Sequence, residues 1–255
     1  MLFQLFSDIH LELNPDENFT LPVKADYLFL AGDIGNIKKQ NYNNFLQYCS
    51  NNWKQVFYVP GNHEFYNRRS MESNIEKMTE LVNKFKNVHL LINNYVQIDN
   101  YTIYGFIGWT YPIFKTSNAA KEYLNDYHNI KTRVGKFTIN YHQSLAADGI
   151  QKFRTFISTA NFDDQIKNII ILTHFPPNQL GTSNPKHTQD NLINYYAWKN
   201  LIQSEKIQTD KIRLWCSGHT HYKYDFVFEN IRYLNNPVGY IEEYLVLDTE
   251  PFELI

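Results

Sequence analysis

Short apolar runs recur along the chain, and each of them stops at a cluster of polar residues. Runs of about five residues rich in Val, Ile, Phe and Tyr are typical of strands buried on both faces. The runs that we predict as buried strands cover residues 2–6, 26–31, 55–59, 168–173 and 212–217. The polar clusters at their ends are therefore candidates for a functional site.

A helical period follows the third run. Apolar residues recur there at spacings of three and four, with charged residues on the other face, and they are Met71, Ile75, Met78, Leu81, Val82 and Phe85. This spacing predicts an amphipathic helix over residues 68–86, whose role is packing.

Further short strands follow without long crossings between them. VHLLIN, YVQIDN and YTIYGFIG, over residues 88–108, are punctuated by Asn-Asn and Asp-Asn turns, and YDFVFEN with IRYLNN, over 224–236, has the same form. Meanders give antiparallel strands, whereas strands joined through a helix are usually parallel, so their presence in one chain indicates mixed sheets. We predict an α/β (α+β) fold in which two such sheets lie face to face with helices outside.

Residues 110–165 have weaker periodicity and many polar and aromatic residues. We expect helical segments and loops there, over one rim of the sheets. The length of 255 residues is within the range of one large domain, and neither an internal repeat nor a low-complexity linker divides the chain. We therefore expect a single domain over 1–255.

Composition excludes several classes of protein. The formal charge of -2 gives no overall basic field for nucleic acid, and no apolar run is long enough to cross a membrane or to form a signal peptide. Cys49 and Cys216 lie in no CxxC pair, so we expect both to be reduced and structural. The expectation is a soluble cytoplasmic protein.

The polar clusters after the buried strands share one property, because each offers side chains that bind metal ions. They are Asp8-Ile9-His10, Gly32-Asp33, Gly61-Asn62-His63-Glu64, His174 and Gly218-His219-Thr220-His221. A lone histidine at a strand end is more often a hydrogen-bonded structural residue than a ligand. Five clusters at five strand ends can meet in one crevice, however, and together they predict a metal site.

Local geometry supports this prediction. In an extended segment Asp8 and His10 point to the same side, about 7 Å apart along the strand, while Ile9 faces the core. Gly32, Gly61 and Gly218 stand at sharp exits from the strands, where a side chain would crowd the backbone and where small residues leave room for phosphate.

The order DxH, GD, GNHE, H and GHTH resembles that of the calcineurin-like metallophosphoesterases, from residue 8 to residue 221. The segments LFSDIHLE, ADYLFLAGDI, YVPGNHEFY, LNDYHNI and NPVGY are similar to a bacterial-type branch of that family. The resemblance implies a four-layer αββα sandwich of two mixed β-sheets flanked by helices. It also implies a binuclear metal site at the carboxyl ends of the strands.

Carried onto matching positions, the resemblance assigns ligands to two divalent ions. Asp8, His10, Asp33 and His221 would bind one ion; Asp33, Asn62, His174 and His219 would bind the other, with Asp33 as the bridge. Mixed carboxylate, amide and imidazole donors suit transition metals, so Mn is expected first and Fe, Zn, Co or Ni are alternatives. His63 would face the substrate and protonate the leaving oxygen or stabilise charge. Glu64 is expected to orient the turn.

Three positions depart from the family pattern. Asn36 stands where many members have an Asp that hydrogen-bonds the catalytic histidine, and the Arg that follows that Asp is missing as well. Phe175 replaces a second histidine, and Val238 replaces an arginine. These departures argue against a protein phosphatase and leave the substrate open.

For the substrate we expect a small phosphodiester or phosphomonoester, with nucleotides among the candidates. Trp109, Tyr111, Asp126, Tyr127 and His128 fall in the region expected above the metals, where an aromatic ring could stack a base, although large aromatics mostly pack in cores. Two alternatives remain open. One is a nuclease, which would need basic surface strips; the other is a catalytically silent scaffold of the same fold.

Overall fold

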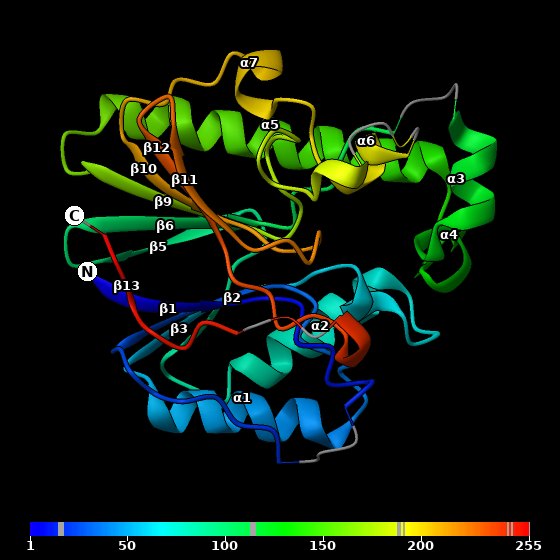
Figure 1. The fold of residues 1–255 in the computed structure, drawn as a ribbon, viewed down its shortest axis with the longest axis horizontal. Coiled ribbons are helices and arrows are strands. Elements are labelled where there is room, and N and C mark those ends of the chain that lie inside the picture. Colours follow the sequence, from blue (N-terminus) through cyan, green and yellow to red (C-terminus); the bar gives the residue numbers. More distant parts are fainter. Residues whose placement is uncertain are drawn as a thin grey trace.

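Two β-sheets stack face to face, and helices cover their outer faces in the computed structural model (Figure 1). The structure describes residues 1–14, 18–112, 116–187, 190, 192–243, 245 and 247–254. The first sheet has the order β13-β1-β2-β3-β4 and the second has the order β11-β12-β10-β9-β6-β5. The αββα sandwich expected from the sequence is confirmed.

In the first sheet the neighbouring strands β1 to β4 run parallel and β13 is antiparallel. Its strands are β1 (Leu2–Phe6), β2 (Tyr27–Ala31), β3 (Gln55–Val59), β4 (Val88–Leu90) and β13 (Phe252–Glu253). Phe6 pairs with Leu30, and Leu30 pairs with Tyr58. This register ends the three central strands at one level, so the polar segments that follow them emerge together.

The second sheet is parallel in its centre and antiparallel at both edges. Its strands are β5 (Asn94–Ile98), β6 (Tyr101–Phe106), β9 (Asn168–Thr173), β10 (Ile212–Cys216), β11 (Tyr224–Phe228) and β12 (Ile231–Asn235). Leu172 pairs with Cys216 near the carboxyl ends of β9 and β10. The segments after these two strands therefore also leave the sheet side by side.

Helices occupy two positions relative to the sheets (Figure 1). Those on the outer faces are α1 (Gln40–Asn52) and α2 (Met71–Val82) on the first sheet, with α5 (Ile139–Phe162) and α7 (Leu201–Glu205) on the second. Toward the carboxyl ends of the strands lie α3 (Ser117–Tyr123), α4 (Asn125–Asn129) and α6 (Ile193–Tyr196). Short elements complete the fold: β7 (Lys131–Thr132), β8 (Gly135–Lys136), η1 (His63–Phe65), η3 (Pro185–His187) and η4 (Ile241–Glu243).

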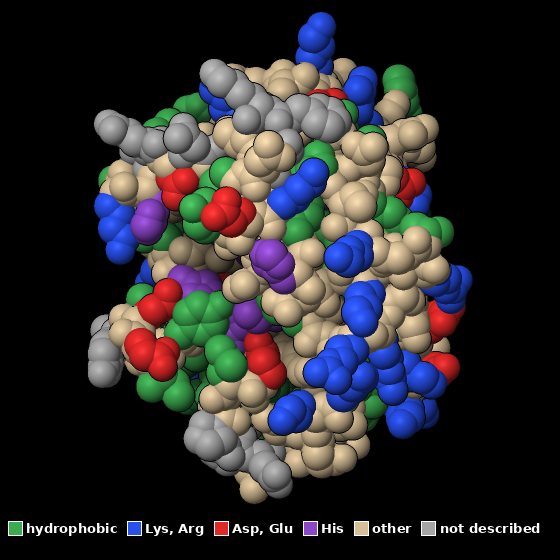
Figure 2. Space-filling model, turned by 90° about the vertical axis from the view of Figure 1, so that its right-hand side faces the viewer, with side chains coloured by type: hydrophobic (Ala, Val, Ile, Leu, Met, Phe, Trp, Pro, Cys, Tyr) green, Lys and Arg blue, Asp and Glu red, His purple; other side chains and the backbone are tan. Residues whose placement is uncertain are grey.

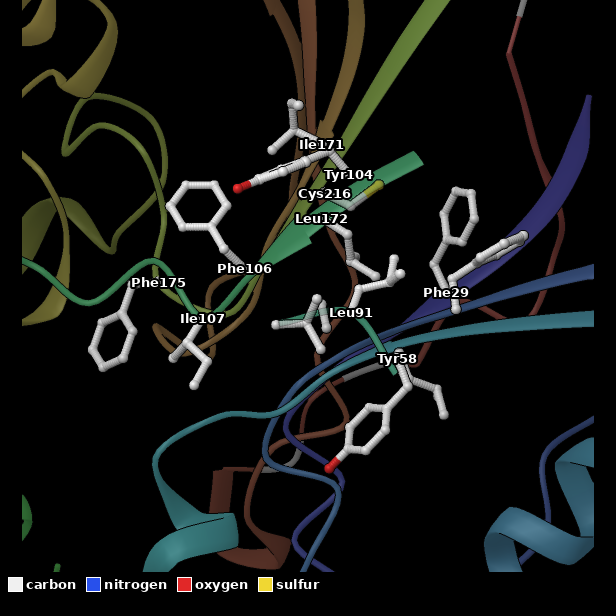
Figure 3. Packing of buried hydrophobic residues seen from close by; sticks show 14 of the residues in the cluster. Phe29, Tyr58, Leu91, Tyr104, Phe106, Ile107, Ile171, Leu172, Phe175 and Cys216 are labelled. Atoms are coloured by element: carbon white, nitrogen blue, oxygen red, sulfur yellow. The ribbon is translucent and has the colours of Figure 1, made fainter. Parts of the chain in front are cut away.

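Apolar side chains from the facing sheets form one buried layer between them. Phe29 of the first sheet and Leu172 of the second point into this layer, beside Leu91 (Figure 3). Tyr58 and Phe106 point to the outer faces, where Tyr58 contacts Tyr42 of α1 and Phe106 packs on Phe153 of α5. Cys49 and Cys216 are both buried and unpaired, as expected. No helix within the described residues is both long and apolar enough to cross a membrane. The core therefore fixes the relative position of the strand ends from which the site is built.

The buried strands match the apolar runs closely, since β1, β3 and β9 have the predicted bounds. The helix expected over 68–86 is confirmed but shorter, because Ser70 caps its start by accepting a hydrogen bond from the backbone N–H of Ser73. The meander expected over 88–108 is wrong in one respect. Strand β4 belongs to the first sheet, and the chain crosses to the second sheet between Leu91, which bonds to Tyr58, and Asn93, which bonds to Gly105.

Residues 110–165 divide into two parts. The segment with α3, α4 and the β7-β8 hairpin lies toward the strand ends, whereas α5 is a helix of 24 residues on the outer face of the second sheet (Figure 1). The buried stripe of α5 has helical spacing but contains His142, Ala146 and Gly149 among its apolar members. These small and polar residues weaken the apolar pattern from which a long helix is predicted.

Candidate metal centre

The seven residues expected to bind metal meet at the carboxyl ends of the parallel strands. In the first sheet, Asp8 and His10 follow β1, Asp33 follows β2 and Asn62 follows β3. In the second sheet, His174 follows β9, and both His219 and His221 follow β10. This edge is where open α/β sheets bind ligands. Side chains distant in the sequence thus share one crevice.

One half of the centre contains Asp8, His10 and His221, which offer donor atoms within 4.8 Å of one another. The Nε2 atoms of His10 and His221 are 3.0 Å apart, and Nε2 of His221 lies 3.6 Å from Oδ1 of Asp8. Asp33 extends this group, because its Oδ2 lies 4.0 Å from Nε2 of His10.

The other half contains Asp33, His174 and His219, again within 4.8 Å. Nε2 of His174 lies 3.0 Å from Oδ1 of Asn62, 3.1 Å from Nδ1 of His219 and 3.4 Å from Oδ2 of Asp33. The Oδ2 atom of Asp33 therefore faces both halves, which is the position that a bridging ligand requires.

In three of the histidines, the hydrogen-bond partner of Nδ1 shows which ring nitrogen has the lone pair that could bind a metal. Nδ1 faces Glu12 in His10, Glu243 in His221 and the carbonyl oxygen of Ala31 in His174, at 3.2, 2.5 and 2.9 Å. Because these partners accept hydrogen bonds, each Nδ1 has the proton in the neutral ring and Nε2 has the lone pair. Lone pairs thus converge with carboxylate and amide oxygens. This donor set fits a divalent transition metal.

The electrostatics around the buried carboxylate of Asp33 also favour the binding of a cation. Burial raises the pKa of Asp33, but His174 and His63 outweigh this effect and hold that pKa well below its usual range. Burial lowers the pKa of His174, and the carboxylate of Asp33 outweighs it and raises the pKa to about 9. The site therefore attracts positive charge, and metal binding would release protons from it.

Five of the seven expected ligands have left-handed backbone conformations. Their φ angles are 53° for Asp8, 50° for His10, 54° for Asp33, 71° for His219 and 49° for His221. Such angles are uncommon outside glycine and are concentrated at functional sites. The extended geometry expected for Asp8-Ile9-His10 is therefore wrong, although Ile9 is buried in the core as expected.

Glycines allow these segments to approach one another closely. A Cβ atom on Gly32, whose φ is +85°, would lie 2.4 Å from Nδ1 of His174, and one on Gly61 would lie 2.1 Å from Oδ1 of Asp33. The space that we expected to be left for phosphate is thus occupied by the side chains of His174 and Asp33.

Glu64 is fully buried and joins two of the loops that form the centre. Its carboxylate accepts hydrogen bonds from the backbone N–H groups of Asp33, Ile34 and Gly61 at 2.7–3.1 Å, and from the hydroxyl of Tyr58 at 2.8 Å. The expectation that Glu64 orients its turn is confirmed. It also fixes the segment that presents Asp33.

His63 is held beside the centre by a carboxylate that the sequence analysis did not identify. Its Nδ1 donates to Oε1 of Glu12 at 2.8 Å, and its Nε2 lies 4.0 Å from Oδ2 of Asp33. Asn36, the residue at the position of the family aspartate, instead accepts a hydrogen bond from the backbone N–H of Lys38. Burial opposes the charge of His63, yet Asp33 and Glu12 raise its pKa to about 9. The acid in LFSDIHLE, two residues after His10, was the available signal for Glu12.

A second carboxylate orients Asn62. Nδ2 of Asn62 donates to Oδ1 of Asp126 and to the hydroxyl oxygen of Tyr66, both at 2.9 Å, and the hydroxyl of Tyr66 donates to the same Asp126 oxygen. These bonds turn the amide so that Oδ1 of Asn62 faces His174. Asp126 therefore lies in the site, in contact with a candidate ligand.

The other residues expected to contact substrate lie elsewhere. Trp109 and Tyr127 are buried, and they pack with Phe137 and His142 in an aromatic cluster, where the hydroxyl of Tyr127 contacts Nδ1 of His142. The side chain of His128 contacts the carbonyl oxygen of Glu122, and Tyr111 is half exposed. None of these four residues lines the pocket beside the metal centre. For Trp109 and Tyr127 the physical reason is that large aromatic side chains gain more from burial than from exposure at an open rim.

A pocket of about 370 Å³ opens beside the candidate ligands. Its wall includes Asp33, Asn62, His63, His219 and His221, together with Tyr66, Tyr123, Tyr195, Tyr196, Tyr240, Asp126, His187, Asp190 and Glu243. Phe175 is buried with its ring centroid 4.1 Å from that of His219, so it supports a candidate ligand instead of facing substrate. Figure 2 shows histidine side chains exposed on this face.

Known proteins share both sequence and fold with this chain. The model of the calcineurin-like phosphoesterase family matches residues 1–223. An uncharacterized protein of Acanthamoeba polyphaga mimivirus is 31% identical, and the match covers 95% of this chain and 92% of that protein. Among solved structures, the phosphopantetheinyl hydrolase of Mycobacterium tuberculosis has a TM-score of 0.67 at 16% identity, over 95% of this chain and 91% of its own. A dimetal phosphatase from Danio rerio has a TM-score of 0.57 at 13% identity, over 93% and 87%.

Proposed function

The chain belongs to the calcineurin-like phosphoesterase family, and on that premise we propose that it hydrolyses a phosphodiester or phosphomonoester with the help of two divalent metal ions. The observation that carries the proposal is the convergence of imidazole nitrogens and carboxylate and amide oxygens around Oδ2 of Asp33. A silent scaffold would be expected to lack some of these donors, whereas all seven residues lie together here.

The ligand assignment follows the two halves of the centre. Asp8, His10 and His221 would hold one ion; Asn62, His174 and His219 would hold the other, and Asp33 would be shared. Bound divalent ions would polarise the phosphoryl group and lower the pKa of a water molecule. The pocket beside them is large enough for a small phosphoester.

His63 is the proton donor in this proposal. His63 lines the pocket, and the hydroxyl oxygen of Tyr240 lies 3.5 Å from Nε2 of His63. Because Nδ1 is bonded to Glu12, the ring keeps the orientation in which a proton on Nε2 can pass to the leaving oxygen. Glu12 is a positioning residue, which also stabilises the charged form of the ring.

The function is tested with bis-p-nitrophenyl phosphate and p-nitrophenyl phosphate. We expect hydrolysis of at least one of them with added Mn, loss of that activity after chelation, and recovery on adding metal back. Absence of hydrolysis with Mn, Fe, Zn, Co and Ni alike would refute the proposal. Hydrolysis that persists after complete chelation would refute the role of the metal.

Replacing Glu12 with Gln is expected to lower kcat by about 10- to 100-fold, because outer partners of site histidines contribute effects of this size. The loss should be greater for a phenyl ester than for the p-nitrophenyl ester, since only the poorer leaving group depends strongly on proton donation. The measurement is kcat for both esters at saturating metal.

Glu243→Gln is the matched control, because Glu243 accepts a hydrogen bond from Nδ1 of His221 as Glu12 does from His63. That variant should alter the metal concentration needed for activity without changing the ratio of the two esters. Equal ester ratios in Glu12→Gln and the wild type would mean that Glu12 does not act through His63, and that its 3.2 Å contact with His10 explains its effect.

A further inference from the structure

Basic side chains gather on one side of the face that exposes the histidines (Figure 2). Seven of the 24 Lys and Arg residues of the chain lie on three neighbouring segments, which we call the basic surface: Lys38, Lys39, Arg68, Arg69, Lys131, Arg133 and Lys136. All are exposed except Arg69, which is half-buried. A net charge of -2 for the whole chain conceals this local excess.

Contacts between the segments show that the basic surface is continuous. Nζ of Lys38 donates to the carbonyl oxygen of Asn67 at 2.5 Å, directly before Arg68 and Arg69. Ser70, which follows these arginines, forms a bridge with Lys131, the first residue of the β7-β8 hairpin. The loop of residues 67–70 thus lies between Lys38 and the hairpin.

Each of the three segments leaves directly from the candidate metal centre. Lys38 follows Asp33 in the loop after β2, and Arg68 follows His63 and Tyr66, which line the pocket. The hairpin follows α4, whose Asp126 bonds to Asn62. The three segments of the basic surface therefore each follow, within ten residues of the sequence, a residue that lines the pocket.

Most of these cations lack an acidic partner within the part of the chain that the structure describes. Arg133 pairs with Glu76, and its backbone N–H bonds to Glu72, but no carboxylate pairs with the other six. Unpaired cations beside a phosphoester site favour a substrate with additional phosphates.

Tyrosines supply a second kind of contact. Five of them line the pocket: Tyr66, Tyr123, Tyr195, Tyr196 and Tyr240. Tyr123 is 68% exposed, so it is accessible to a ligand. Aromatic rings beside a cationic track are the combination with which proteins bind unpaired nucleic-acid strands, because rings stack bases and cations contact phosphates.

We propose that the substrate is single-stranded nucleic acid, with one phosphodiester at the metal centre, flanking phosphates on the basic surface and a base against the pocket tyrosines. The inference rests on the proposed function. In the reaction, water adds its oxygen to phosphorus, the ester P–O bond breaks, and the leaving oxygen takes one proton. The net charge of -2 gives no strong signal for nucleic acid, and the local distribution of charge is what supports the nuclease alternative.

Binding to a fluorescein-labelled oligothymidylate of about fifteen nucleotides tests the surface by anisotropy in the presence of chelator, so that no cleavage occurs. Replacing Lys131 and Lys136 with Gln is expected to weaken binding and to reduce the slope of log affinity against log salt by about 1.4, at about 0.7 per lost phosphate contact. Hydrolysis of bis-p-nitrophenyl phosphate should stay within about twofold of wild type, because so small an ester makes no flanking phosphate contacts.

Lys86→Gln with Lys167→Gln is the matched control. Both lysines are exposed and stand before β4 and β9, at the opposite end of the sheets from the centre. An unchanged slope in this control, with the reduced slope above, supports the proposal. Equal effects of the two double variants, no binding by the wild type, or tighter binding of a duplex of the same length would overturn it. Failure of the wild type to hydrolyse any phosphoester would instead refute the proposed function. The binding measurement does not depend on hydrolysis, so the two failures can be distinguished.

Discussion

Replacing Asp33 with Asn is expected to abolish phosphoester hydrolysis almost completely. Oδ2 of Asp33 lies 3.4 Å from Nε2 of His174 and 4.0 Å from Nε2 of His10, so this carboxylate oxygen is placed between the two halves of the centre. A neutral amide removes the charge that would hold both ions. We expect kcat/KM for bis-p-nitrophenyl phosphate to fall by at least about 10³-fold, because metal stabilisation is worth several kcal/mol and 1.4 kcal/mol corresponds to about tenfold.

Asp164→Asn is the control for this substitution, because Asp164 is exposed and lies beyond the end of α5, away from the pocket. It should leave kcat/KM unchanged. If Asp33→Asn instead retained more than about a tenth of wild-type activity, a difference of only 1.4 kcal/mol, the carboxylate could not be a shared ligand.

Replacing His63 with Gln is expected to lower kcat for a phenyl phosphodiester by about 10²- to 10⁴-fold, the usual contribution of a positioned proton donor. The p-nitrophenyl ester should lose less, because its leaving group needs little protonation. The measurement is kcat for both esters at saturating metal, together with the metal content of the variant. His63 does not contact the pocket through Nδ1, which is bonded to Glu12.

Metal content separates this role from the alternative. His63, His10 and Asp33 also offer donor atoms within 4.8 Å of one another, which is the spacing of a ligand group. A normal metal content in His63→Gln with the leaving-group effect supports proton donation. Loss of metal would show that His63 is a ligand and not the proton donor.

Apolar runs predicted the central strands because those strands are buried on both faces, so their sequence is almost purely apolar. Helix α1 was missed for the opposite reason. Its sequence, QNYNNFLQYCSNN, buries Tyr42, Phe45, Leu46 and Cys49 at helical spacing, but the polar residues between them hide the period. A helix that is buried on one face is stabilised mainly by tertiary packing, and intrinsic helix propensity does not predict that contribution.

The candidate ligands could be predicted from motif order, since strand ends bring them together. Their geometry could not, because φ angles of about 50° at Asp8 and His10 are imposed by the surrounding structure and have no local sequence signal. Glu12 was likewise hidden: its distance from His63 in the sequence is 51 residues, and only the fold brings the two side chains into contact. Motif position gives no information on side-chain direction, so it could not show that Tyr127 packs against Phe137 and His142.

Net charge gave too coarse a view of the surface for a similar reason. Acidic and basic residues are nearly balanced over the chain, yet the loop after η1 and the β7-β8 hairpin place cations from distant segments side by side. The bridge between Ser70 and Lys131 and the contacts of Arg133 with Glu72 and Glu76 bring these segments together.

The central claim is that Asp33 and the six candidate ligands around it hold two metal ions, and elemental analysis tests this claim most directly. Protein purified without chelator and incubated with Mn is predicted to contain two equivalents of divalent metal per chain, falling to one or none in Asp33→Asn. Less than one equivalent in the wild type would contradict the account, because it would mean that the converging donors do not bind metal.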